Sequence, residues 1–235
     1  MNLLPYIKFG YLNYLRQHRY LREIVVVVIF HIFFWAFLYD SEPDNSIWIV
    51  FCVFAILLNL ITAPSIFFLE KGNTLYFLLS KPYGRRRLFL SKIILIILID
   101  LFWVFIFALI YELRFLSLDF LLELPVRLFL VGSVLFLTTT LISFSYTYRP
   151  HISWLIILLI TLGNIVNKGA LLPIESWSEV YKILIFLLPP LLELNLFTTS
   201  LSFAEINFVF IIWAFIQIII LFMLSYKGMM RKDLL

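Results

Sequence analysis

The chain has 235 residues, of which 63% are apolar and only 14% are charged, and its mean hydropathy is +1.05. A soluble globule of this length needs far more polar surface, so the composition excludes one and predicts an all-α, polytopic membrane protein. The net charge of +4 does not indicate nucleic-acid binding, because the basic residues sort by predicted membrane side and form no single patch. The one cysteine, Cys52, excludes an intramolecular disulfide framework.

Residues 1–23 form a basic and aromatic lead-in before the first apolar run. On a helical wheel, four basic residues fall within about a third of the circumference, although leucines intrude on that arc. Two interpretations stay open: an interfacial helix on the cytoplasmic leaflet, or an irregular segment that only sets topology. Because no small-residue cleavage site follows the apolar run, we expect the first span to act as an uncleaved anchor.

Six apolar segments are candidates for membrane spans, judged against the ~20 residues that cross a hydrocarbon core. They lie at residues 24–39, 47–69, 88–111, 126–147, 151–167 and 207–226. With both termini in the cytoplasm, fourteen basic residues fall in cytoplasmic segments and four in external ones, as the positive-inside rule requires. We therefore expect a single multi-pass transmembrane domain that covers residues 1–235.

The stretch 70–92 between the second and third spans holds six of the basic residues, which places it in the cytoplasm. Within it, Thr74 to Ser80 is predicted to be helical, with Leu75, Leu78 and Leu79 at i, i+3, i+4 spacing. A glycine precedes this turn, and a proline and a glycine follow it. The pattern predicts a short amphipathic helix that a soluble partner could bind.

This stretch resembles the signature of ABC-2 type permeases, the membrane subunits of ATP-driven exporters. The pattern is Glu-x-Gly-x-Thr-Leu-x-x-Leu-Leu-Ser-Lys-Pro with a later Arg, in which Asn73 separates a Gly and a Thr that usually adjoin in the family. The six-span plan of the whole chain is similar to that family as well. The resemblance implies a coupling helix that docks on a separate ATPase, with these candidate coupling residues: Glu70, Gly72, Thr74, Leu75, Leu78, Leu79, Ser80, Pro82 and Arg85.

The segment 168–206 before the last span is too long for a simple loop and too apolar to be solvated. Its apolar run Ile183–Leu188 is too short to span and is followed directly by Pro189-Pro190. Broken backbone at membrane depth is tolerated only where protein buries it or where it lines a cavity. We expect a re-entrant or interfacial helical hairpin with the proline pair at its break, which the ABC-2 plan also contains. The alternative is an ordinary external loop with an interfacial helix.

Asp100 is the ionisable residue nearest the middle of a predicted span, where a carboxylate usually faces the bundle interior or water. It either marks a translocation path or an interface between two permeases, or it is a protonated or hydrogen-bonded packing residue. The hydroxyls of Thr138, Thr139 and Ser143 either support helix packing or line the same path. Lys92 lies roughly 12 Å from Asp100 along the helix, so we expect it to extend to the cytoplasmic interface instead.

The sequence contains no nucleotide-binding loop, no known catalytic motif and no metal-ligand spacing. We therefore expect no catalytic or metal-binding residues and no enzyme activity or cofactor on this chain. The resemblance implies that ATP and Mg bind a partner ATPase, and that the other partners are a second permease copy or paralogue and membrane lipid, with no nucleic acid.

The function that the resemblance implies is export across a bacterial plasma (inner) membrane, with both chain termini in the cytoplasm. The substrate class stays open among lipids, glycoconjugates, apolar peptides and drug-like molecules. One alternative uses the ATPase stroke mechanically, to transmit force or to extract a lipid or lipoprotein. Another is a non-transporting intramembrane enzyme or scaffold, which the absence of paired catalytic groups in the spans disfavours.

Overall fold

The computed structural model describes residues 3–38, 45–69, 73–81, 83–148, 153–168, 183, 185–201 and 208–231. Over these residues the chain is all-helical and contains no strand, which confirms the all-α part of the predicted fold. The helices are α1 (Leu4–Arg16), α2 (Tyr20–Phe33), α3 (Trp35–Leu38), α4 (Ile47–Phe67), α5 (Asn73–Ser80), α6 (Gly84–Phe115), α7 (Leu118–Tyr148), α8 (Ser153–Ile165), α11 (Leu191–Ser200) and α12 (Phe208–Arg231).

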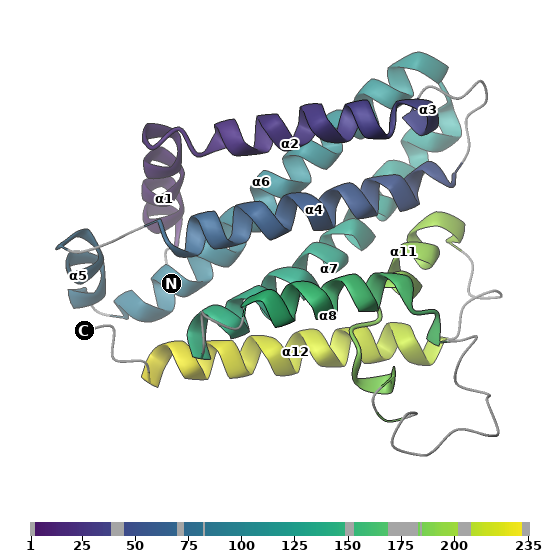
Figure 1. Cartoon of the computed structure of the whole chain (residues 1–235). Coiled ribbons are helices and arrows are strands. Elements are labelled where there is room, and N and C mark those ends of the chain that lie inside the picture. The colour runs from purple at the N-terminus through teal and green to yellow at the C-terminus, as the bar shows by residue number, and fades with distance from the viewer. Residues whose placement is uncertain are drawn as a thin grey trace.

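Four of the described helices, α4, α6, α7 and α12, are long and apolar enough to cross a membrane. They run side by side along the long direction of the molecule (Figure 1). The expected first and fifth spans correspond to α2, with 14 residues, and α8, with 13. Each of these is shorter than the ~20 residues that a straight span needs.

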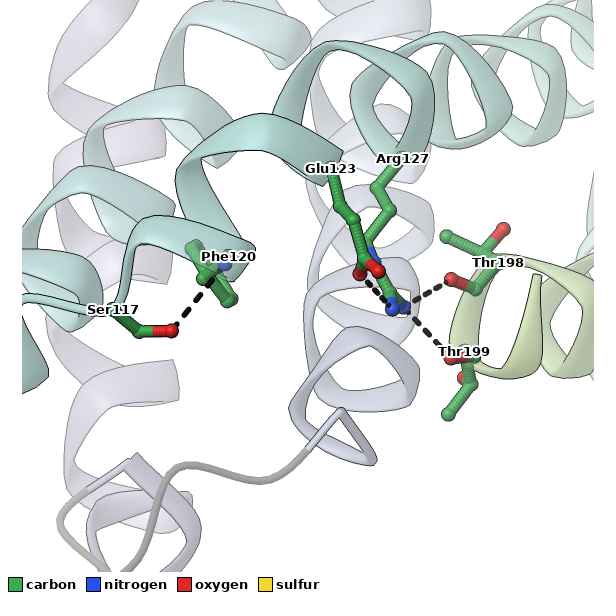
Figure 2. Close-up of polar contacts among 6 residues, drawn as sticks. All are labelled: Ser117, Phe120, Glu123, Arg127, Thr198 and Thr199. Carbon is green, nitrogen blue, oxygen red and sulfur yellow. Dashed lines mark hydrogen bonds and ion pairs between the residues drawn. The ribbon is translucent and has the colours of Figure 1, made fainter.

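The helices α6 and α7 extend beyond the predicted spans 88–111 and 126–147. Hydropathy finds only the apolar part of a helix, and the Arg, Glu and Leu residues at these ends are good helix formers that continue it. Leu116 ends α6 in a left-handed conformation, with φ of 51°. Ser117 then accepts a hydrogen bond from the backbone N–H of Phe120 at 3.4 Å (Figure 2), which is the N-cap geometry that starts α7.

The central helix is α4, which contacts α2, α6, α7 and α11. Fifteen of its 21 residues are buried. An apolar cluster that includes Phe54 and Phe107 surrounds its first half, and a second that includes Ile66 and Phe89 surrounds its second half. The inward-facing polar residues of α4, Asn59 and Thr62, are fully buried.

One end of the bundle gathers the elements that the sequence analysis assigned to the cytoplasm. The helices α1 and α5, the start of α6 and the end of α12 all lie there, and α1 crosses the direction of the bundle (Figure 1). We call this the α5 end. Since residues 4–16 form a regular helix, the irregular alternative for the lead-in is wrong over that range.

Candidate functional site

The short helix α5 connects the end of α4 to the start of α6, as the pattern of leucines predicted. Leu78 is buried and Leu79 is half-buried, whereas the Phe77 side chain is 61% exposed. The Lys81 ammonium nitrogen lies 4.6 Å from the centroid of the Phe77 ring. Phe77, which the i, i+3, i+4 pattern did not include, is therefore an exposed aromatic side chain of α5.

Of the other predicted coupling residues, Thr74 and Leu75 lie on α5, but their side chains are not among those described. Glu70, Gly72 and Pro82 lie outside the described residues. Ser80 donates its hydroxyl to the Phe77 carbonyl at 2.8 Å. This bond supplies a donor to one of the last carbonyls of α5, which lack helical partners.

A close backbone approach fixes α5 against α6. A Cβ atom at Gly84 would lie 2.2 Å from the carbonyl oxygen of Leu78, so a residue larger than glycine cannot occupy this position without moving α5. Tyr83 adopts φ of 58°, and the Gly84 N–H donates to the Lys81 carbonyl at 2.8 Å. The turn between the two helices is therefore tight, so α5 and the first turn of α6 are expected to move together.

Arg85, another predicted coupling residue, contacts a helix end within the chain. Its Nη1 donates to the carbonyl of Met230 at 2.9 Å, near the C-terminal end of α12. The positive charge complements the negative end of the α12 helix dipole. Nearby, a Cβ at Gly228 would lie 2.6 Å from Cγ2 of Thr147, so α12 and α7 also approach closely at this end.

Two more cations bind the C-terminal end of α4. The Nζ atom of Lys92 donates to the carbonyl of Phe67 at 2.8 Å, and Lys92 is buried. The guanidinium of Arg19 donates to the carbonyl of Ser65. The expected extension of Lys92 to the cytoplasmic interface stays a prediction, and its ammonium lies at the C-terminal end of α4. Its charge is used to cap a helix.

Asp100 belongs to a buried cluster built from α4, α6 and α7. The side-chain Nδ2 of Asn59 donates to Asp100 Oδ2 and to Thr139 Oγ1, both at 2.8 Å, and all three residues are fully buried. Thr138 is not part of this contact, because its hydroxyl donates to backbone carbonyls of its own helix. Ser143, one turn further along α7, is also buried. The structure thus brings Asp100 and Thr139 together and leaves Thr138 and Ser143 apart from them.

The cluster continues to a second carboxylate, Glu23 at the start of α2, which is 1% exposed. Glu23 accepts hydrogen bonds from the Tyr14 hydroxyl of α1, from Thr62 of α4 at 3.3 Å and from Trp103 of α6 at 3.3 Å. Burial, and then the bond to Glu23, raise the pKa of the Tyr14 phenol, which keeps Tyr14 the donor. Thr62 lies three residues after Asn59 on α4, and Trp103 lies three residues after Asp100 on α6. The two carboxylates therefore belong to one buried polar cluster.

Sequence reasoning missed Glu23 as a site residue. The available signal was an acid in the first turn of an apolar helix, without a basic residue three or four positions later. Its three donors come from segments 9 to 80 residues away, which no spacing rule relates.

The backbone around the proline pair is hydrogen-bonded by side chains of neighbouring helices. Pro190 has no N–H, so the Phe186 carbonyl loses its helical donor; Trp213 Nε1 of α12 donates to it at 2.8 Å. Gln217 Nε2 donates to the Leu187 carbonyl at 3.1 Å, and Lys168 Nζ donates to the Leu188 carbonyl. Side chains of the same bundle therefore donate hydrogen bonds to the backbone carbonyls at the helix break.

The helix that follows the break, α11, is held at its C-terminal end by Arg127 of α7. Arg127 is 1% exposed, and its Nη1 donates to the carbonyls of Thr198 and Thr199, both at 2.7 Å (Figure 2). Glu123, one turn earlier on α7, accepts from Arg127 Nε at 2.9 Å. A Cβ at Gly163 of α8 would lie 2.4 Å from the Pro189 carbonyl oxygen. Of the predicted region 168–206, residues 169–182, 184 and 202–206 lie outside the described residues.

The polar contacts described above join one helix to another. Among these residues no group of three or more His, Cys, Asp or Glu side chains could hold a metal ion. Comparison of the chain with protein-family models, with curated proteins and with solved structures finds no match.

Proposed function

We propose that the chain is the membrane subunit of an ABC-2 type exporter. It works with separate ATPase subunits, which bind ATP and Mg, and with a second permease copy or a paralogue. The observation that carries the proposal is α5: a short helix between two candidate spans that buries Leu78, exposes Phe77 and is fixed to α6 at Gly84. An ATPase that moves Phe77 moves the start of α6 with it.

The proposal includes six spans with both ends of the chain in the cytoplasm of a bacterial cell. The first span is α2 with α3, which together cover residues 20–38, close to the ~20 residues that a span needs. Backbone bonds continue through the turn between them, from Phe34 to Phe30 at 2.9 Å and from Leu38 to Phe34 at 3.0 Å. The fifth span is α8, followed by the broken helix at Pro189-Pro190 and by α11 as a re-entrant element. The donors from α12 support this, because such backbone needs internal partners.

In this proposal, the buried cluster transmits movement from the α5 end to the interior of the bundle. Glu23 receives donors from α1, α4 and α6, and Asn59 joins α4 to α6 and α7. A displacement of α6 at Gly84 therefore changes contacts that reach α7. In the proposed cycle, this cluster connects ATPase closure to a change in the path between two permeases.

The test of the proposal is Phe77→Ala. Loss of an aromatic anchor from a docking contact typically costs about 2 kcal/mol or more, which is roughly a 30-fold loss of affinity. We expect the variant to insert in the membrane at normal abundance while the ATPase no longer co-purifies with it in detergent, and export to fall accordingly.

The matched control is Phe129→Ala, which removes an aromatic side chain that is 70% exposed on α7, away from α5. This control should keep both the ATPase and export. Leu78→Ala is a poor docking test because Leu78 is buried, so its loss disturbs the packing of α5 itself. Full ATPase retention and full export in Phe77→Ala would overturn the proposed role of α5.

A further inference from the structure

A groove of about 600 Å³ opens at the α5 end between the first turns of α6 and the last turns of α12. The bond from Arg85 to the Met230 carbonyl holds these two helix ends together. The groove volume falls in the range of roughly 300–1,000 Å³ that is typical of small-molecule sites. The proposed function above does not use this groove.

Both walls of the groove change from basic to apolar in the same direction. On α6, Arg86 is followed one turn later by Leu90; on α12, Met223 is followed at one-turn intervals by Lys227 and Arg231. Because α6 begins and α12 ends at the α5 end (Figure 1), the three cations gather at that end and the apolar residues lie further along the bundle. All three cations are exposed.

We propose that this groove binds one membrane phospholipid with an anionic headgroup. The phosphate lies against Arg86, Lys227 and Arg231, and an acyl chain follows Leu90 and Met223 along the bundle. Basic pockets between membrane helices suit such headgroups, and the described lining contains no carboxylate that would oppose the charge. A soluble anion could use the cations but would gain nothing from the apolar half of the groove.

The experiment titrates the purified chain in detergent with phosphatidylglycerol or with phosphatidylcholine and counts bound lipid by native mass spectrometry. Each basic residue near an anionic headgroup contributes about a fivefold factor in affinity, so R86Q/K227Q/R231Q should weaken phosphatidylglycerol binding on the order of 100-fold. Phosphatidylcholine binding should change little. The matched control, K8Q/R16Q/R22Q, removes two exposed cations of α1 and one at the start of α2, at the same end, and should leave phosphatidylglycerol binding within a few-fold of the original.

Two further measurements separate a lipid from a soluble anion. Met223→Gln should weaken phosphatidylglycerol binding several-fold, and inorganic phosphate at equal concentration should not displace the lipid. Equal binding of the two lipids, or equal losses in the two triple variants, would show general electrostatic attraction and overturn the site. Full displacement by phosphate with no effect of Met223→Gln would assign the groove to a soluble anion and overturn the lipid.

Discussion

The buried carboxylates Asp100 and Glu23 receive their hydrogen bonds from neutral groups. Asn59 donates to Asp100, and Tyr14, Thr62 and Trp103 donate to Glu23. The free-energy cost of burying a polar group falls when it is hydrogen-bonded, so these donors make such acids tolerable inside the bundle. The sequence left Asp100 as either a path or interface residue or a protonated or hydrogen-bonded packing residue, and in the structure Asn59 of α4 donates to it.

Asp100→Asn separates the charge of this residue from its packing. The amide oxygen can still accept the bond from Asn59, so we expect normal abundance and a thermal stability within about 1 kcal/mol of the original. Export, measured per inserted permease, should fall because the carboxylate belongs to the proposed coupling cluster. Asp100→Leu serves as the comparison and should cost about 1–3 kcal/mol by leaving the Asn59 amide without this acceptor. Normal export in Asp100→Asn would make Asp100 a packing residue only.

Glu23→Ala should detach α1 from the bundle. The substitution removes the acceptor of three donors, and each buried donor left unpaired costs about 1–3 kcal/mol. We expect a lower unfolding temperature in detergent and faster tryptic cleavage after Arg16 on α1. Arg22→Ala, next to it and exposed, is the control and should match the original protein. Unchanged cleavage and stability in Glu23→Ala would contradict the role of Glu23 in holding α1.

At the scale of elements, four buried or half-buried cations among the described residues cap the C-terminal ends of helices. Arg19 and Lys92 donate to carbonyls at the end of α4, Arg85 to one at the end of α12, and Arg127 to two at the end of α11. A helix ends with four carbonyls that lack helical partners and carry a partial negative charge. Long basic side chains from neighbouring helices supply donors to these carbonyls.

Arg127→Gln tests this capping at α11. The shorter, neutral side chain cannot reach both carbonyls and leaves Glu123 without its partner, so we expect a loss of roughly 2–4 kcal/mol in the free energy of unfolding. The loss should appear as a lower unfolding temperature and as faster hydrogen exchange confined to α11. Glu123→Gln, which keeps the bonds from Arg127 to the carbonyls, should cost less than half as much. Equal costs for the two variants would show that the ion pair, not the cap, holds the helix.

At the scale of the whole molecule, the sequence predicted the helical class, a short helix from Thr74 to Ser80, which the structure begins at Asn73, and the break at Pro189-Pro190. Each of these depends on local signals: apolar length, leucine spacing and the missing proline N–H. It did not predict the buried positions of Lys92 and Arg127, or that Phe77 of α5 is exposed while Leu78 is buried. Those outcomes depend on which neighbouring helix lies within reach, and sequence spacing alone carries no such information.

The orientation of the bundle can be tested with single cysteines at Lys81 and Leu116, both exposed and at opposite ends of α6. The native Cys52 is buried and can be replaced by serine for this experiment. The asymmetry of basic residues predicts that an impermeant thiol reagent labels position 116 in intact cells. Position 81 should react only after permeabilisation, and its labelling in intact cells would contradict the proposed topology.

The central claim, that α5 is the docking element for an ATPase, is tested most directly by cross-linking in native membranes. A photoreactive phenylalanine analogue is placed at Phe77 or, as the control, at Phe129, and the cross-linked partners are identified by mass spectrometry. The account predicts that position 77 captures a nucleotide-binding ATPase subunit and that position 129 does not. Capture of no ATPase at position 77, or equal capture at both positions, would contradict it.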